Sequence, residues 1–269
     1  MNGSGDRWIL PDLQSALRWS AKRNGEGIRC VLDVLGEYAG NEREAAESVE
    51  ACLSCLQAIR DHGLDASLSV KTTALGATFD HGLAREHVLA LSREAARLAV
   101  GLEIDMEGRG LVVQTLEIAV ECARQGRPPA LALQAYLNRT PGDLHEVIKH
   151  RIRPRIVKGA YIGDTGDPYE IRRRFVELVL IAHGQKAPFA VGTHDPDLIG
   201  WLVIRFAETK ESLEFGFLKG LSNITKIALA ERGWPVAEYV PFGSRRAAYE
   251  ARRRRYLQEL HRLGRKAAS

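Results

Sequence analysis

The sequence predicts an α/β fold of the (βα)8-barrel type, the TIM barrel, in which parallel strands alternate with helices. Short apolar runs of strand type alternate with stretches of helical periodicity about eight times, in units of roughly 30 residues. An open doubly wound sheet fits less well, because no Gly-x-Gly-x-x-Gly motif follows the first strand. No linker or low-complexity segment interrupts the pattern, so we expect residues 1–269 to form one domain.

The expected elements follow one another along the chain. A helix over residues 11–24 flanks the barrel and precedes the first strand-like run, Ile28–Leu35. From Asn41, with Glu44 three residues later as a capping pair, apolar residues recur at helical spacing until Gly63. A helix is also expected after each later strand. Those strand-like runs are Ala66–Lys71, Leu102–Asp105, Ala130–Ala135, Arg155–Lys158, Phe189–Gly192, Leu213–Phe217 and Val236–Val240.

Composition excludes several classes of protein. The chain is 45% hydrophobic, enough for a large core, and its net charge of +4 gives little support to nucleic-acid binding. Four cysteines do not form the dense pattern of a secreted disulfide scaffold, and Cys52-x-x-Cys55 lies in a helical repeat, where we interpret both as core residues. No signal segment opens the chain, and no apolar run approaches the ~20 residues that cross a bilayer. We therefore expect a cytoplasmic protein.

Polar side chains stand where most expected strands end, and the active site of a (βα)8 barrel lies at these carboxyl ends. Each alone is compatible with a helix cap or a solvated rim residue. Together they indicate a pocket for a small anionic substrate and a polar cofactor. No His, Glu and Asp trio has metal-ligand spacing, and no Ser or Cys has a base beside it. The strand-end residues include Lys71, Asp105, Gln134, Lys158, His194 and Tyr239.

Several longer motifs contain these residues, in order, from the second strand to the last helix. They are Ser69-Val70-Lys71, Ile104-Asp105-Met106-Glu107, Gln134-Ala135-Tyr136-Leu137, Arg155-Ile156-Val157-Lys158-Gly159-Ala160-Tyr161, Gly192-Thr193-His194, Glu214-Phe215, Tyr239-Val240-Pro241-Phe242-Gly243 and Tyr249-x-x-Arg252-Arg253. In this set and order the sequence resembles the proline dehydrogenase family, flavoenzymes with a distorted (βα)8 barrel. Motifs at separate strand ends are more specific than any single short pattern.

The resemblance implies FAD as cofactor, L-proline as substrate and a quinone as the acceptor of the electrons. A hydride would pass from the ring carbon beside the nitrogen to flavin N5, which gives Δ1-pyrroline-5-carboxylate. Carried over by position, Lys71, Arg252 and Arg253 would hold the substrate carboxylate, because a guanidinium binds a carboxylate through two parallel hydrogen bonds. Tyr239 and Tyr249 would form walls of the pocket, and Tyr239 would favour proline over hydroxyproline.

The resemblance also assigns residues to catalysis and to the cofactor. Asp105 would orient Lys71 and keep it charged. Arg155 would lie beside flavin N5 and stabilise the negative charge that builds up on reduction. Gly159 would allow the backbone to approach the cofactor closely. The full set of expected cofactor contacts is Met106, Gln134, Arg155, Lys158, Gly159, Ala160, Tyr161, Thr193, His194 and Glu214.

Two positions depart from the family pattern. Gly216 stands where the family usually has glutamine, and Tyr256 stands where it has a glutamate one turn after the arginine pair. The run of four arginines also makes the assignment depend on helical register. Tyr249 shares a helix face with residues three and four positions later, which favours Arg252 and Arg253 and directs Arg254 and Arg255 elsewhere.

An aldolase of the Schiff-base type is an alternative enzyme. It would use Lys71 or Lys158 with Asp105 nearby, on the same barrel. A lysine in that role needs a lowered pKa, and Gln134 and the arginine pair would have no explanation. Flavin absorbance of the purified protein would separate the two enzymes.

The basic carboxyl-terminal segment 245–266 suggests a non-enzymatic alternative, a site for nucleic acid or for an anionic membrane. Nucleic acid is disfavoured, since aromatic stacking positions and a base-reading motif are absent. Peripheral contact with the inner face of a membrane is a hypothesis based on Arg254, Arg255, Arg262 and Arg265, because each arginine adds up to ~1 kcal/mol at an anionic surface.

Overall fold

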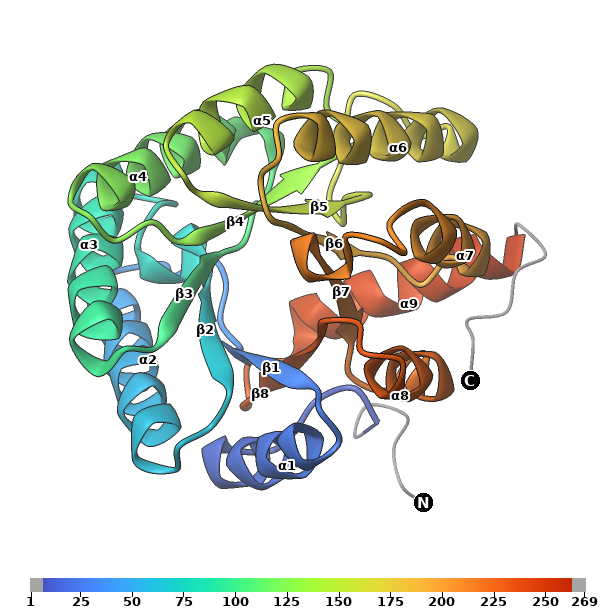
Figure 1. Ribbon diagram of the computed structural model, residues 1–269. Coiled ribbons are helices and arrows are strands. Elements are labelled where there is room, and N and C mark those ends of the chain that lie inside the picture. The colour runs from blue at the N-terminus through green and yellow to red at the C-terminus, as the bar shows by residue number, and fades with distance from the viewer. Residues whose placement is uncertain (1–6, 263–269) are drawn as a thin grey trace.

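The centre of the molecule is a closed barrel of eight parallel strands (Figure 1). The computed structural model describes residues 7–262, with side chains to residue 258. Each strand pairs with the next along the chain, and β8 pairs with β1, which confirms the predicted (βα)8 barrel. The strand bounds lie within two residues of those expected. They are β1 Arg29–Val34, β2 Ala66–Val70, β3 Gly101–Ile104, β4 Ala130–Gln134, β5 Arg153–Val157, β6 Phe189–Gly192, β7 Leu213–Leu218 and β8 Val236–Phe242.

Helices surround the barrel, and the ring departs from regular geometry at one place. The helix before the first strand, α1 (Leu13–Gly25), packs on β1 and β8 and lies between α8 and α2 in Figure 1. A regular barrel has the helix after β8 in this position. The outer helices are α1, α2 Glu42–Asp61, α3 His81–Leu98, α4 Val112–Arg124, α5 Thr140–Lys149, α6 Pro168–Gly184, α7 Pro196–Arg205 and α8 Asn223–Glu231, with short 3₁₀ turns η1 Thr72–Leu75, η2 Arg109–Leu111 and η3 Lys210–Ser212.

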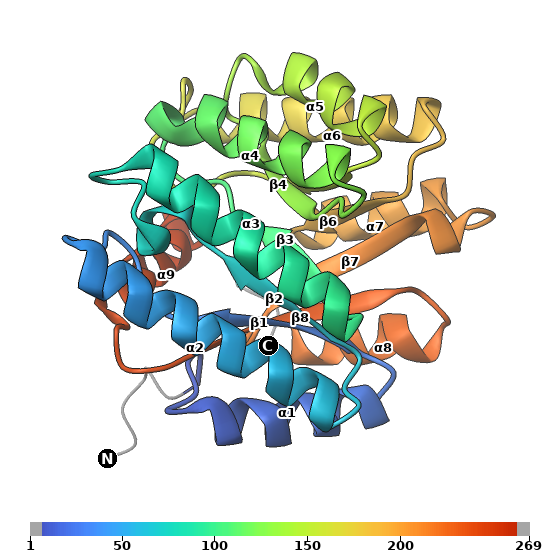
Figure 2. The same ribbon diagram turned by 90° about the vertical axis from the view of Figure 1, so that its left-hand side faces the viewer.

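The helix that follows β8, α9 (Ala247–Arg262), lies across the end of the barrel where the strands finish (Figure 2). Its Tyr249 packs in one apolar cluster with Tyr239 of β8 and with Leu35, which follows β1. Its Arg252 is bound to Glu37 in the loop after β1. The last helix therefore brings side chains to the carboxyl ends of the strands, where a barrel enzyme has its active site.

Local sequence signals fix the helix starts. The amide of Glu44 donates to the Asn41 side chain at 3.0 Å, and the Glu44 carboxylate accepts from the amide of Gly40 at 3.0 Å. This is the reciprocal cap that the sequence predicts for α2. In α7, the Asp195 carboxylate accepts from the amides of Asp197 and Leu198, with proline in the first turn. Such caps satisfy amides that have no partner within the helix.

An apolar layer fills the space between the strands and the outer helices. It contains fully buried side chains of strands, such as Leu32 and Leu68, and of helices, such as Leu56. Cys52 and Cys55 on α2 belong to this layer and are free thiols, in agreement with the interpretation as core residues. None of the helices in residues 7–262 combines the length and apolar character needed to span a bilayer.

Candidate active site

Inside the barrel, eight charged side chains form a chain in which positive and negative groups alternate. Near the amino ends of the strands, Arg29 donates to both oxygens of Glu214 at 3.0 Å. Glu103 then contacts Arg29 at 2.9 Å and Arg155 at 3.2 Å. Because buried charges are tolerated when they are paired, the alternation accounts for so polar an interior. In order, the alternating chain is Arg153, Glu214, Arg29, Glu103, Arg155, Asp105, Lys71 and Asp33.

Near the carboxyl ends of the strands, the ammonium of Lys71 lies between Asp105 and Asp33, the last member of the alternating chain. Its Nζ contacts Asp33 Oδ1 at 2.7 Å, the Tyr239 hydroxyl at 3.0 Å and Asp105 Oδ2 at 3.1 Å. The Tyr239 hydroxyl donates to Asp105 Oδ2 at 2.6 Å. Burial favours the neutral amine, but the negative charges of Asp33 and Asp105 outweigh it and hold the pKa of Lys71 well above its ordinary value. Lys71 therefore stays charged.

The two carboxylates on Lys71 differ in their environments. Burial disfavours the charge of Asp105, but Lys71 and Arg155 outweigh burial and lower its pKa. Arg155 Nη2 lies 2.6 Å from Asp105 Oδ1. Among the described residues, Lys71 is the cation in contact with Asp33, and burial raises the pKa of Asp33. The expected residues Lys71, Asp105, Arg155 and Tyr239 are thus brought together, with Asp33 added.

Helix α9 carries the arginines that the sequence singled out. Arg253, 3% exposed, donates to the Tyr249 hydroxyl at 2.9 Å and to the carbonyl of Lys219 at 3.3 Å. Both partners are uncharged groups, and among the described residues no carboxylate contacts this guanidinium. Burial lowers the pKa of Arg253. A buried cation with only neutral partners is costly, so the position is suited to an anion.

Arg252 lies beside Arg253 but has an acidic partner. Its Nη1 donates to Glu37 Oε2 at 2.6 Å, and its guanidinium lies 4.9 Å from the centre of the Tyr161 ring. Arg254 and Arg255 are exposed. The inner face of α9 therefore carries Arg252 and Arg253, as the helical spacing from Tyr249 predicts.

At the end of β4, Gln134 is buried and half satisfied. Its Nε2 donates to the carbonyls of Met106 at 3.1 Å and Glu107 at 3.2 Å, which fixes the direction of the amide. Its Oε1 has no hydrogen-bond partner among the described residues. A buried acceptor without a partner is suited to an N–H donor of a bound ring.

After β5, the run from Lys158 to Tyr161 packs against Tyr136. Gly159 has a φ of 122°, and a Cβ there would lie 1.8 Å from the Tyr136 ring. The Tyr136 hydroxyl accepts from the amide of Tyr161 at 3.0 Å. The sequence suggested that glycine makes room for a cofactor, whereas the contact that requires it here is with Tyr136. Ala160 is exposed, and Lys158 Nζ lies 3.1 Å from Asp195 Oδ2.

Thr193 and His194 follow β6 and are buried. Thr193 Oγ1 accepts from the amide of Asp195 at 3.2 Å. His194 Nδ1 lies 3.0 Å from the Ser222 hydroxyl, and its Nε2 accepts from the amide of Leu218 at 3.3 Å. Burial lowers the pKa of His194 to about 3, so the ring is neutral at physiological pH.

One expected residue lies apart from the others, and two were missed. Glu214 is near the amino end of β7, bound to Arg29 and Arg153 at the lower end of the alternating chain. Asp33 and Glu37 had no assigned role in the sequence. A signal existed for Asp33, because this carboxylate follows the apolar run Cys30–Leu32 near the carboxyl end of the strand.

The chain is similar in sequence to known proline dehydrogenases. The family model described as proline dehydrogenase matches residues 16–171, more than half of the chain. Proline dehydrogenase 1 of Bacillus subtilis (strain 168) is 32% identical over 255 residues, which cover 92% of this chain and 84% of the relative. The proline dehydrogenase of Deinococcus radiodurans is 26% identical over 254 residues, covering 90% of this chain and 82% of the relative.

Solved structures share the fold. Proline utilization A (PutA) from Bdellovibrio bacteriovorus superimposes with a TM-score of 0.85 at 18% identity, and PutA from Bradyrhizobium japonicum with 0.78 at 19%. The superpositions cover 95% and 94% of this chain but only 32% and 30% of the PutA chains, so this chain spans about a third of their length. On the family match and the identity to the Bacillus enzyme, the chain belongs to the proline dehydrogenase family of oxidoreductases.

Proposed function

We propose that this protein oxidises L-proline to Δ1-pyrroline-5-carboxylate with bound FAD and passes the electrons to a quinone. The observation that supports an amino-acid substrate is the environment of Arg253, a buried guanidinium that donates hydrogen bonds to a hydroxyl and a carbonyl. The carboxylate of an amino acid would supply the missing negative charge through two parallel hydrogen bonds.

Binding of the substrate would require neighbours to exchange partners. Lys71 has three oxygens around its ammonium, and Arg252 is bound to Glu37. Each of the two cations would give up part of its present hydrogen bonds and donate to the substrate carboxylate instead. Tyr239 and Tyr249 belong to the apolar cluster at the strand ends, so they would cover the ring methylenes of proline. Because the two tyrosine rings would exclude water from the pocket, the electrostatic contacts to the substrate carboxylate would be stronger.

The residues at the strand ends fit a flavin. Gln134 Oε1 is a buried acceptor without a partner, suited to an N–H of the isoalloxazine ring. Arg155 remains charged, because Asp105 and Glu103 outweigh its burial and raise its pKa, so it would stabilise negative charge on the reduced ring. Bound flavin supplies the hydride acceptor. The other residues proposed to hold it are Met106, Lys158, Gly159, Ala160, Tyr161, Thr193 and His194.

The alternative of a Schiff-base aldolase is weakened by Lys71. Such a lysine must lose its proton to act as a nucleophile. Here two carboxylates and the Tyr239 hydroxyl surround the ammonium, and the pKa is raised. The arrangement keeps Lys71 as a cation, which suits binding of an anion.

An anaerobic titration tests the proposed function. Purified protein loaded with FAD is expected to lose its flavin absorbance as L-proline is added, and to regain it when a soluble quinone is supplied. Protein that binds no FAD, or whose flavin is not bleached by L-proline, would contradict the proposal.

The role of Arg253 is tested by Arg253→Met. Loss of a buried partner of the carboxylate costs at least about 2 kcal/mol, so the KM for L-proline should rise about 30-fold or more. FAD content should stay unchanged. The matched control is Arg254→Met on the same helix, where the side chain is 63% exposed and the KM should not change. Equal KM values in the two variants would exclude Arg253 from the substrate site.

Contact with a membrane, where quinones reside, is a further part of the proposal. Arg254 and Arg255 form an exposed basic face on α9. Arg265 and Lys266 lie outside the described residues, as does the side chain of Arg262. We expect binding to vesicles rich in anionic lipid that weakens when Arg254, Arg255, Arg262 and Arg265 are replaced by glutamine. Undiminished binding of that variant would rule out the basic segment as the contact.

A further inference from the structure

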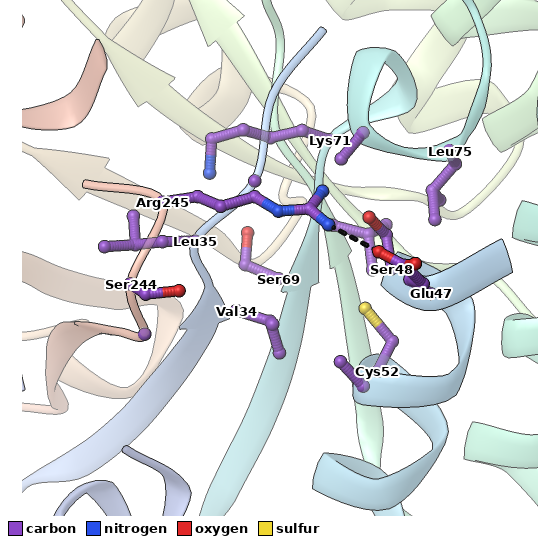
Figure 3. Close-up of a pocket in the computed structure, with 15 residues that line it drawn as sticks. Val34, Leu35, Glu47, Ser48, Cys52, Ser69, Lys71, Leu75, Ser244 and Arg245 are labelled. Carbon is purple, nitrogen blue, oxygen red and sulfur yellow. Dashed lines mark hydrogen bonds and ion pairs between the residues drawn. The ribbon is translucent and has the colours of Figure 1, made fainter. Parts of the chain in front are cut away.

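A pocket of about 180 Å³ opens where β1 and β2 stop pairing (Figure 3). The last paired residues of these strands are Asp33 and Ser69. Beyond them the strand ends diverge, and the first half of α2 and the segment 243–245 complete the walls. We call this the lateral pocket. Its lining includes Ser48, Ala51 and Cys52 of α2, Ser69 and Lys71 at the end of β2, and Arg245.

The outer end of the lateral pocket lies at the protein surface. Arg245 extends across it and contacts Glu47 Oε2 of α2 at 3.0 Å, as Figure 3 shows. The two side chains are 43% and 51% exposed. An exposed ion pair of this kind contributes at most ~1 kcal/mol, so it is a weak closure. The lining of the pocket thus runs from this exposed pair to the buried residues Ser69 and Lys71.

Two buried side-chain oxygens at this depth have no hydrogen-bond partner among the described residues. Ser69 Oγ belongs to a residue that lines the pocket, and Asp33 Oδ2 belongs to the residue paired with Ser69 on the neighbouring strand; each residue is 1% exposed. The two residues face each other in the strand register, so their side chains are neighbours. Leaving such atoms unsatisfied costs about 1–3 kcal/mol each. Bound water, which needs 2–4 polar partners and about 30 Å³ per molecule, fits both the volume and the unpaired oxygens.

The proposed reaction has to release a proton. The amine of L-proline carries two protons at neutral pH, and one N–H bond must break before the ring C–H bond can give its electron pair to the oxidised flavin. Asp105 is held by Lys71, Arg155 and the Tyr239 hydroxyl. Asp33, in contrast, has one oxygen, Oδ2, for which the described part of the chain offers no hydrogen-bond partner. Asp33 is therefore the carboxylate with a free position for a proton.

We propose that the lateral pocket holds a chain of water that carries the proton from the substrate amine, by way of Asp33, to bulk solvent. The inference rests on the proposed function. The amine N–H bond breaks, an O–H bond forms at Asp33 Oδ2, and the proton passes to pocket water, which restores the carboxylate. The groups that face Asp33 are Lys71 just after β2, Asp105 just after β3, Tyr239 of β8, Cys52 of α2 and Tyr249 of α9.

Ala51→Leu tests the inference, because it fills the pocket from α2 without altering a proposed substrate or cofactor residue. The control is Ala46→Leu, an exposed position on the same helix. With bound FAD, Ala51→Leu should slow flavin reduction by L-proline about tenfold or more and raise its solvent deuterium isotope effect. The affinity for a ring-oxygen analogue of proline, which has no amine proton, should stay the same. Equal rates and isotope effects in the two variants would overturn the proton route.

Crystallography gives an independent readout. A crystal structure of the wild-type protein should show ordered water from Asp33 Oδ2 and Ser69 Oγ to the Glu47–Arg245 pair, and Ala51→Leu should displace it. A dry pocket in the wild type would overturn the inference whatever the rates. If Ala51→Leu does not fold, Ser69→Ala removes the inner hydroxyl and should raise the isotope effect in the same direction. Wild-type flavin that L-proline does not bleach would instead refute the proposed function.

Discussion

The two faces of the barrel wall are stabilised by different physics. Outside, the apolar layer between strands and helices relies on burial and close packing, which are not directional. Inside, the alternating chain relies on charges that each need a partner at the right distance. An apolar layer tolerates substitutions of similar volume, whereas a buried charge left unpaired is strongly destabilising. The outer face of the wall should therefore tolerate substitutions of similar volume, whereas the inner face should not tolerate loss of a charged partner.

Arg29→Met should show the largest effect, because it interrupts the alternating chain. It leaves Glu103 and Glu214 without the cation between them, at an expected cost of about 3–5 kcal/mol in the free energy of unfolding. Urea denaturation followed by circular dichroism would measure it. The control is Arg85→Met, whose partner is Glu121 on the protein surface, with an expected loss below ~1 kcal/mol. Similar losses of stability in both variants would mean that the buried ion pairs of Arg29 contribute no more than an ion pair on the surface.

Leu56→Ala probes the outer side. Leu56 is fully buried on α2, so its truncation should cost about 2–5 kcal/mol through lost burial and the cavity left behind. The loss should be the same at pH 7 and pH 4, because no titrating group is involved. A pH-dependent loss would show that the two faces of the wall are coupled.

The smallest expected effect is a pH dependence of the free energy of unfolding, which should come from the charged inner face and not from the apolar outer face. Arg29 and Arg155 lower the pKa of Glu103, and Lys71 and Arg155 lower that of Asp105, in each case against the effect of burial. Their stabilisation is present above the ordinary values of 4.5 and 3.8 and is lost as the pH falls. Asp33 acts with the opposite sign, since its pKa is raised and its contribution is lost as the pH rises.

Arg29→Met removes one cause of the lowered pKa of Glu103. The stability of the variant should therefore fall less than that of the wild type when the pH is lowered. The difference in the free energy of unfolding between wild type and Arg29→Met should therefore become smaller as the pH falls from 7 to 3. Urea titrations at several pH values would measure it. A constant gap would indicate that Glu103 keeps its low pKa without Arg29.

The apolar face of the wall could be predicted from residue patterns, whereas the resemblance to the family named only part of the charged face: Lys71, Asp105, Arg155 and Glu214. Runs such as Phe189–Gly192 show a buried strand directly, because apolar residues and their neighbours are local in the chain. Arg29, Glu103 and Glu214 stand singly within apolar runs, and their pairing depends on the barrel register. The Arg252–Glu37 pair joins residues 215 positions apart, so no local pattern could indicate it.

The sequence also did not predict that α1 would take the place in the outer ring that the helix after β8 has in a regular barrel. The segment 11–24 was expected to flank the barrel, and α1 does pack beside β1 and β8. Both α1 and α9 are helices of suitable length for the position between α8 and α2. Their competition is decided by tertiary packing, which periodicity does not report.

The use of α1 in the outer ring has a consequence for synthesis of the protein. Every strand and every helix of the ring ends by Phe242, before α9 begins at Ala247. On a ribosome, where the amino-terminal part of a chain emerges first, the whole wall is available before the helix that carries Arg252 and Arg253. The barrel can thus close before α9 has been synthesised, and the substrate site is completed only when Arg252 and Arg253 of α9 follow.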